Sequence, residues 1–325
     1  MTKAVREHLI KALANGAFVS GQMLGEELNI SRTAISKHIK ALISMELDIY
    51  SVRGKGYKLS KSLNLLSQKK IIDALPKGNS TPKIEVHSLI DSTNSYLLRR
   101  LPNHLSQGQV CVAEYQSAGR GRRGRQWISP FGSQIYLSIY WFLEQGLSAA
   151  MGLSLVTALA VSDAVYALTN IKVQLKWPND IYIDGAKLAG ILIDLEGQAL
   201  EPSHSVIGVG LNVDMPTQAA IKIGQKWTDL QSHSKDKIDR NLLSAELIHY
   251  LLKRLEDYQN EGLVEMVNEW HAQDFYLNKK VKLLTGERAI KGVCRGVNAQ
   301  GALLLEVDGK IKTIYGGEVS LRGDE

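Results

Sequence analysis

The segment AGRGRRGRQW, residues 118–127, contains a G-x-G-x-x-G match, and the residues around it decide which fold class the chain can adopt. A mostly apolar run, Val110 to Tyr115, precedes the glycines and predicts a strand. In a dinucleotide-binding loop, a helix would start within the glycines. Here Pro130 and Gly132 follow instead, and large apolar residues recur at every second position from 135 to 141, which predicts another strand. The match is therefore accidental, and the segment is predicted to be a glycine-spaced loop between two strands of a sheet.

The same loop carries arginine at four positions, 120, 122, 123 and 125. Guanidinium groups bind phosphate oxygens in bidentate pairs, so such a loop could close over a polyanion. Two other interpretations stay open for this segment alone: a solvated basic loop, or an arginine–glycine segment that binds RNA without sequence preference.

The first sixty residues hold nine Lys and Arg against five Asp and Glu, which is most of the surplus behind the formal net charge of +6. Two helical patterns between residues 18 and 45 are separated by a tight turn, and Ser31 is well placed to cap the second helix. That helix has an apolar inner face and an outer face of Arg, Lys, Ser and Thr, as a recognition helix for the major groove of DNA requires.

Residues 47–59 then predict two short strands around a basic, glycine-rich turn, typical of a wing that lies along the DNA backbone. We interpret residues 1–62 as a winged helix-turn-helix DNA-binding domain, although such domains also serve as protein-interaction modules. The candidate DNA contacts are Arg32, Thr33, Ser36, Lys37, Lys40, Arg53 and Lys55.

Polar composition and a Gly/Asn/Ser/Thr/Pro stretch predict a linker at residues 63–82, followed by a central domain at 83–273. Residues 274–325 form a run of short strand patterns, typical of a small antiparallel barrel, and we expect this part to be a capping module. Its predicted turns are at 285–286, 299–301 and 308–309.

The two cysteines, Cys111 and Cys294, lie in short apolar runs without a C-x-x-C pair or neighbouring histidines. We expect both to be reduced core residues and predict neither a disulfide nor a zinc site. The most apolar stretch, 147–168, is interrupted by Ser, Thr and Asp, and the N-terminus is an amphipathic helix pattern. We therefore expect no signal peptide or membrane span, and we place the protein in the cytoplasm.

Further polar clusters lie at predicted strand ends of the central domain. Residues 91–94 form a short polar turn between a strand and a helix. Residues 176–180 end another strand, and Lys187 begins the next apolar strand after a hairpin turn at 184–185. One more strand ends in the glycine-rich segment 208–212.

The segments DSTN, AEYQSAGRGRRGRQW, KWPNDIY, KLAGIL and GVGLNV, in this order behind a winged helix, resemble the bacterial biotin protein ligases that double as repressors of the biotin operon. The resemblance spans essentially the whole chain. It implies an α+β multidomain fold with an N-terminal winged helix-turn-helix, a central mixed-sheet class II biotin ligase domain and a small SH3-like β-barrel at the C-terminus.

Ligases of this kind join the biotin carboxylate to the α-phosphate of ATP, and then pass biotin to a lysine of the biotin carboxyl carrier protein of acetyl-CoA carboxylase. The first step gathers negative charge around phosphorus and needs preorganised cations. The resemblance therefore implies biotin and ATP as ligands, with Mg²⁺ accompanying ATP. It also implies Arg122, Lys187 and Asp180 as catalytic residues, where Asp180 would contact the metal or orient the incoming lysine.

The other site residues are assigned by matching the family's motifs position by position. The biotin pocket is expected to contain Ser92, Thr93, Asn94, Gln116, Gly119, Arg120, Gly121, Arg122 and Lys187. The nucleotide side is expected to contain Arg125, Trp127, Lys176, Trp177, Asn179, Asn212, Trp227 and Arg322. For Trp177 a core position, and for Trp227 a partly buried surface position, are nearly equal alternatives.

The resemblance also implies regulation: biotinyl-AMP that no acceptor consumes promotes homodimerisation and binding to operator DNA of the biotin genes, in competition with the carrier protein for one sheet surface. Two alternatives stay open. The chain could be a transcription factor that senses biotin without catalysis, but such a sensor would not need Arg122 and Lys187. It could also be an enzyme of the same fold that acts on lipoate or octanoate.

Overall fold

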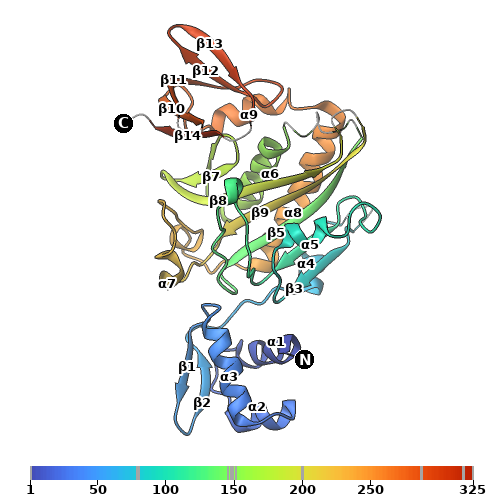
Figure 1. Ribbon diagram of the computed structural model, residues 1–325, viewed down its shortest axis with the longest axis vertical. Helices are drawn as coiled ribbons and strands as arrows, with labels where there is room; N and C mark the ends of the chain where they lie inside the picture. Colours follow the sequence, from blue (N-terminus) through green and yellow to red (C-terminus); the bar gives the residue numbers. More distant parts are fainter. Residues whose placement is uncertain are drawn as a thin grey trace.

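A computed structural model describes residues 2–77, 81–144, 146, 150, 152–198, 201–285, 288–316 and 319–323. Three parts follow one another along the chain: a helical domain with a hairpin, a central domain built on a large sheet, and a small β domain at the C-terminal end (Figure 1). The multidomain α+β fold expected from the sequence is confirmed. Within the described part of the chain, no helix combines the length and apolarity needed to cross a bilayer.

The N-terminal domain is a winged helix-turn-helix, as predicted. Ser20 and Ser31 cap its second and third helices, and Ser31 Oγ accepts from the N–H of Ala34 at 3.1 Å. The two strands of the wing pair antiparallel, and Gly56 at the end of their turn takes φ +99°, a backbone conformation that favours glycine. The elements are α1 (Thr2–Leu13), α2 (Gly21–Leu28), α3 (Arg32–Ile43), β1 (Ile49–Val52) and β2 (Gly56–Leu59).

The central domain is built on a seven-stranded mixed sheet in the order β3-β4-β5-β9-β8-β7-β6. Strands β3 and β4 are parallel, and all other neighbours are antiparallel. The two strands predicted on either side of the arginine loop are β4 and β5, so the loop lies between strands as expected. The strands are β3 (Ile84–His87), β4 (Val110–Ala113), β5 (Gln134–Leu143), β6 (Gln174–Lys176), β7 (Asp180–Ile183), β8 (Ala186–Glu196) and β9 (Ser203–Asn212).

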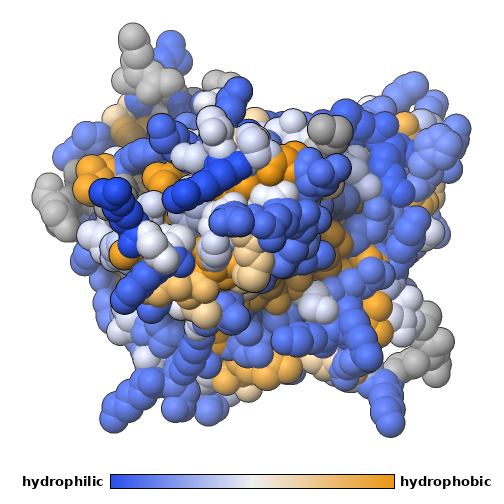
Figure 2. Space-filling model, turned by 90° about the horizontal axis from the view of Figure 1, so that it is seen from below, coloured by the Kyte–Doolittle hydropathy of each residue, from blue (hydrophilic) through white to orange (hydrophobic). Residues whose placement is uncertain are grey.

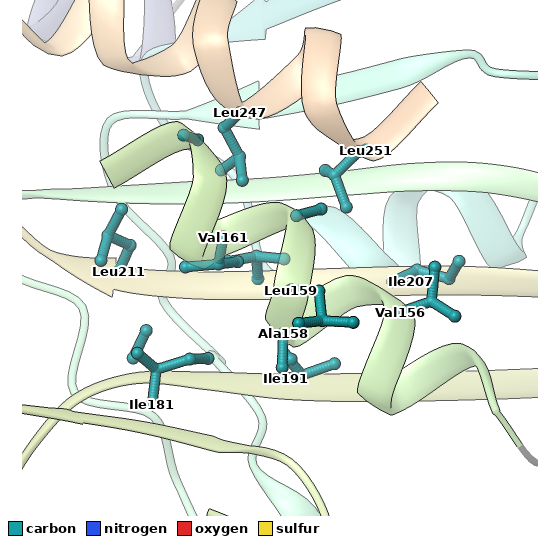
Figure 3. Close-up of a cluster of buried hydrophobic side chains, with 14 of the residues drawn as sticks. Val156, Ala158, Leu159, Val161, Ile181, Ile191, Ile207, Leu211, Leu247 and Leu251 are labelled. Atoms are coloured by element: carbon teal, nitrogen blue, oxygen red, sulfur yellow. The ribbon is translucent and has the colours of Figure 1, made fainter. Parts of the chain in front are cut away.

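Helices α6 and α8 pack on each other, and α6 also packs on the sheet, which forms the main hydrophobic core. Leu159 and Val161 of α6 lie between the side chains of α8, such as Leu251, and those of the strands, such as Ile191 (Figure 3). This double contact explains why the α6 sequence is apolar on nearly every side. The helices are α4 (Gln68–Ala74), α5 (Thr93–Leu98), α6 (Leu153–Thr169), α7 (Thr217–Ala220), α8 (Arg240–Glu261) and α9 (Met266–Gln273), with short 3₁₀ helices at Arg122–Gly124 and Gln231–His233.

Part of the segment that composition assigned to a linker belongs to this core. Helix α4 packs on α8, and the side chains of Leu66 and Ile71 are buried among those of the central domain. The polar composition of residues 63–82 concealed this packing, because two well-placed apolar side chains are enough to anchor a short segment.

The C-terminal domain is a five-stranded antiparallel sheet in the order β13-β12-β11-β10-β14. Its strands are β10 (Lys280–Thr285), β11 (Arg288–Val297), β12 (Leu303–Val307), β13 (Lys310–Ile314) and β14 (Val319–Gly323). Trp177 Nε1 donates to the carbonyl oxygen of Gly301 at 3.1 Å, and the N–H of Phe275 donates to the carbonyl of Leu175 at 2.8 Å. These bonds attach the C-terminal domain to strand β6 and the segment after it. The second residue of the turn predicted at 285–286 lies outside the described residues.

Candidate active site

The first wall of the site is the start of helix α5. Ser92 Oγ caps the helix by accepting from the N–H of Ser95 at 3.4 Å. The N–H of Thr93 donates to Gln116 Oε1 at 2.9 Å, and this bond connects the helix to the beginning of the arginine loop. Because Ser92, Thr93 and Asn94 are each at most 4% exposed, this turn supplies buried hydroxyl and amide groups.

Two residues that the sequence analysis missed hold this wall in place. Ser138 of β5 is fully buried, with Oγ 2.7 Å from Thr93 Oγ1 and 2.5 Å from Asn94 Oδ1. Asp194 of β8 accepts from Asn94 Nδ2 at 2.8 Å and forms an ion pair with Arg120 at 2.6 Å. The local signal for both was weak, since each is only a polar residue within a mostly apolar strand.

Glycines of the sheet form the floor of the site. A Cβ atom on Gly208 would lie 2.1 Å from Asn94 Oδ1, and one on Gly210 would lie 2.5 Å from Trp127 Cε2. On the neighbouring strand, a Cβ atom on Gly190 would lie 3.0 Å from Cζ3 of the same Trp127 ring. The glycines of KLAGIL and GVGLNV therefore leave the room that these two pocket side chains occupy.

The arginine loop is folded by its own backbone. The N–H of Gly121 donates to the carbonyl of Arg125 at 2.7 Å, and Arg123 takes the left-handed conformation with φ +61°. Arg122 turns inward and donates from Nη1 to Asn179 Oδ1 at 2.9 Å. Burial lowers the pKa of Arg122, an effect that the Asp180 carboxylate opposes. Arg122 is therefore a guanidinium partly removed from water, an environment that strengthens binding of an anion.

Two lysines lie on either side of one carboxylate. Lys187 Nζ is 2.6 Å from Asp180 Oδ1, and Lys176 Nζ is 3.8 Å from Asp180 Oδ2. Lys176 also donates to the hydroxyl of Tyr182 at 2.9 Å, while Lys187 lies 5.5 Å from the ring centroid of Trp127. Burial lowers the pKa of Lys176 to about 8, although Asp180 opposes the shift, and burial raises the pKa of Tyr182. The KWPND and KLAGIL segments thus meet in one charged cluster.

Most of the predicted ligand residues line two adjoining cavities. Both cavities are partly open to solvent. Predicted residues in the first are Ser92, Thr93, Asn94, Gln116, Arg120, Gly121, Arg122, Trp127, Asn179 and Lys187. Those in the second are Gly121, Arg122, Arg125, Trp127, Lys176, Trp177, Asn179, Asp180, Lys187 and Arg322. Arg122 and Lys187 belong to both linings and therefore stand at the junction.

Three predicted residues do not line these cavities. Gly119 packs against Ser129, and Asn212 Nδ2 donates to the carbonyl of Thr228 at 2.9 Å, which positions the loop after β9. The backbone of Trp227 bridges to that of Lys187. Asn212 and Trp227 thus support Lys187 through the backbone of the loop between β9 and α8. Trp177, which does line the second cavity, is also 2% exposed and forms part of the core.

No group of three or more His, Cys, Asp or Glu side chains gathers as a metal site within the described residues. The carboxylate of Asp180 lines the second cavity, but its Oδ1 is already paired with Lys187. Since protein-bound Mg²⁺ takes one or two carboxylates together with substrate phosphates, an Mg²⁺ here would have to be held mainly by the phosphates of ATP.

The candidate DNA-binding residues lie on the surface of the N-terminal domain. The outer-face residues of α3 are exposed, apart from the half-buried Ser36, and Arg53 and Lys55 of the wing are exposed. Lys55 Nζ lies 5.8 Å from the ring centroid of the exposed Phe18. Seen from this end of the molecule, the surface is mostly hydrophilic, with smaller hydrophobic patches between the polar side chains (Figure 2).

Three family models match the chain in the order of its domains. An HTH domain matches residues 5–58, the biotin/lipoate A/B protein ligase family matches 86–212, and the biotin protein ligase C-terminal domain matches 276–322.

Similar proteins cover the whole length of the chain. The bifunctional ligase/repressor BirA of Escherichia coli K12 is 47% identical over 317 residues, covering 98% of this chain and 97% of the relative. The protein of the same description from Bacillus subtilis 168 is 30% identical and covers 99% of this chain and 100% of the relative. Among solved structures, the biotin protein ligase of Aquifex aeolicus in complex with biotin and ATP aligns with TM-score 0.64 at 28% identity, covering 75% of this chain and 100% of the other.

Proposed function

The chain belongs to the family of bifunctional biotin protein ligases and repressors. From this membership we propose which of its residues bind biotin, which bind ATP and which contact DNA. It is an ATP-dependent ligase that attaches biotin to the biotin carboxyl carrier protein of acetyl-CoA carboxylase. The single observation that carries the proposed site is the place of Arg122 and Lys187, which line both adjoining cavities. One cavity would hold biotin and the other the nucleotide, so that the two reacting groups meet between these cations.

The first cavity suits biotin because of its buried, uncharged polar groups. The hydroxyls of Ser92 and Thr93 and the amides of Asn94 and Gln116 offer donors and acceptors to the ureido ring. Arg120, which lines this pocket, forms an ion pair with Asp194. The biotin carboxylate would then point toward Arg122 and Lys187.

In the first half-reaction, a carboxylate oxygen of biotin attacks the α-phosphorus of ATP, and the bond between that phosphorus and the bridging oxygen breaks, releasing pyrophosphate. Negative charge spreads over the phosphoryl oxygens, and fixed cations stabilise it. Arg122 and Lys187 would act at the α-phosphate, with Arg125 and Arg322 along the nucleotide side. Mg²⁺ bound to ATP supplies further charge neutralisation on the phosphates.

In the second half-reaction, the amine of the acceptor lysine attacks the acyl carbon of biotinyl-AMP, the bond from that carbon to the phosphate oxygen breaks, and AMP leaves. The incoming side chain is an ammonium in solution and has to lose a proton before it attacks. Asp180 is the carboxylate of the second cavity and would orient this ammonium.

For the repressor activity, the exposed residues of α3 and of the wing would contact operator DNA of the biotin genes. Biotinyl-AMP would promote homodimerisation when no carrier protein consumes it, so that the same intermediate serves both reactions and regulation. Arg and Lys on α3 can reach base edges and phosphates, and those on the wing can reach phosphates.

The ligase proposal is tested by incubating the protein with ATP, Mg²⁺ and an equimolar mixture of biotin, lipoate and octanoate, and identifying acyl-adenylates by mass spectrometry. We expect biotinyl-AMP alone, and about a 100-fold loss or more in Arg122→Ala and Lys187→Ala. Lys253→Ala, on the exposed side of α8, controls for loss of a positive charge elsewhere. A lipoyl or octanoyl product would change the assigned substrate. Full adenylate formation by both variants would refute the assigned site.

A further inference from the structure

Lys176 is a buried charged residue for which the proposed function has no role. Its side chain is about 3% exposed, and it lies directly across from Asp180 in the antiparallel pairing of β6 with β7. Burial of a lysine is expensive unless the charge is paired and hydrogen-bonded. Lys176 has both partners, Asp180 and the hydroxyl of Tyr182.

Both carboxylate oxygens of Asp180 lie near a lysine, and one of these lysines is also proposed to contact the ligand. Lys187 lies 2.6 Å from Oδ1, and Lys176 lies 3.8 Å from Oδ2. Lys187 also lines the biotin pocket and is proposed to contact the adenylate. When Lys187 turns toward the phosphate and acyl oxygen, Asp180 loses its nearest counter-charge.

Lys176 is placed to stay beside Asp180 when Lys187 turns toward the ligand. Its Nζ is hydrogen-bonded to Tyr182 and lies 4.8 Å from the centroid of the same ring, so the ammonium is fixed from the side of the strand. Tyr182 lies in β7, two residues after Asp180, and is itself buried. Lys176 therefore contacts Asp180 from the strand paired with β7 and lines only the second cavity, whereas Lys187 belongs to the linings of both cavities.

We propose that Lys176 is a positioning residue: it holds the Asp180 carboxylate in place while Lys187 contacts biotinyl-AMP, so that Asp180 can receive the acceptor lysine in the second half-reaction. Tyr182 supports this role by fixing the Lys176 ammonium. The inference rests on the proposed function and separates Lys176 from the nucleotide ligands among which the sequence analysis placed it.

The two half-reactions are measured separately in Lys176→Met, Lys176→Arg and Tyr182→Phe. Adenylate formation is followed with biotin and ATP, and transfer is followed by adding purified biotinyl-AMP to the carrier protein in single-turnover experiments. In Lys176→Met we expect KM for ATP to stay within about threefold, and transfer to slow by about tenfold or more. Lys176→Arg should recover part of the transfer rate, and Tyr182→Phe should slow transfer by a smaller factor. Lys69→Met, an exposed lysine on α4, is the matched control.

Each other outcome has a distinct meaning. A rise of about tenfold or more in KM for ATP with unchanged transfer would make Lys176 a nucleotide ligand and overturn the inference. Equal losses in both half-reactions, without recovery in Lys176→Arg, would reduce Lys176 to a folding role and overturn it as well. If the unmodified protein forms no biotinyl-AMP, the proposed function fails, which the first assay shows before any variant is compared.

Discussion

The backbone N–H of Phe131 lies 3.5 Å from the carbonyl oxygen of Met45, and the ring of Phe131 is buried in the hydrophobic core of the N-terminal domain. Phe131 belongs to the segment that continues from the arginine loop, and Met45 belongs to the turn that follows α3. An ion pair between Lys222 and Glu46 reaches the same turn from the loop after β9. The turn behind the candidate recognition helix is therefore held by two segments that also run to the ligand cavities.

This contact predicts that Phe131→Ala destabilises the packing of the N-terminal domain. Removing a phenylalanine ring from a packed core costs about 3–5 kcal/mol. Urea unfolding and limited proteolysis should show the N-terminal domain released at a lower denaturant concentration or a shorter digestion time. Phe18→Ala, at a position 41% exposed, is the control and should change stability by less than about 1 kcal/mol. If both variants unfolded at the same urea concentration and were digested at the same rate, the Phe131 ring would not hold the domains together.

A second prediction concerns the ion pair between Arg240 and Glu114, whose charged atoms lie 2.8 Å apart with both side chains about 3% exposed. Arg240 also donates to the carbonyl of Asn64, and Glu114 accepts from the N–H of Leu66, so the pair fixes the chain between the domains. Arg240→Met leaves a buried carboxylate without its counter-charge, and we expect a loss of about 3–5 kcal/mol in the free energy of unfolding.

The matched experiment is the double variant Arg240→Met with Glu114→Gln, compared with each single variant in urea unfolding. The neutral amide removes the stranded charge, so the double variant should be more stable than Arg240→Met alone. Strictly additive losses would show that the two side chains act independently.

The sequence predicted those parts of the site that are local in the chain. Period-two alternation identified β5, and the strand that follows the glycines excluded a dinucleotide loop, because side-chain periodicity reports backbone geometry directly. The roles of Asp194 and Ser138 were not predicted. Periodicity indicates which face of a strand a residue occupies, but not which side chain it contacts on that face. The partners of these two residues, Asn94 and Arg120, are far away in the sequence. The pairing of β5, β9 and β8 places Ser138 and Asp194 on one sheet, and the packing of α5 on β5 and β9 brings Asn94 to them.

A third prediction tests the glycine floor of the proposed biotin pocket. In Gly208→Ala the new methyl group would lie 2.1 Å from Asn94 Oδ1, so the amide has to move away from its bond to Asp194. We expect KM for biotin to rise by about tenfold or more, while KM for ATP changes little. Gly316→Ala is the control, because a Cβ there meets no atom within 4 Å. An unchanged KM for biotin in Gly208→Ala would place the ureido ring elsewhere.

The last prediction separates the two kinds of DNA contact on the N-terminal domain. Arg32 lies at the start of α3, where a side chain can reach base edges, and Lys55 lies in the turn of the wing, where it can reach phosphates. Arg32→Ala should weaken binding to the promoter region of the protein's own biotin genes by about 1–3 kcal/mol and leave binding to a random duplex nearly unchanged. Lys55→Ala should instead weaken both duplexes by a similar factor and reduce the slope of log affinity against log salt by about one.

Both variants are measured in the presence of biotinyl-AMP at several salt concentrations, with Lys253→Ala on α8 as the charge control. The difference in salt slope is the decisive readout, because a base contact and a phosphate contact both lower affinity at a single salt concentration. If Lys55→Ala left the salt slope unchanged, the wing would not touch the DNA backbone. If Arg32→Ala weakened the random duplex as much as the promoter, α3 would hold DNA without reading its sequence.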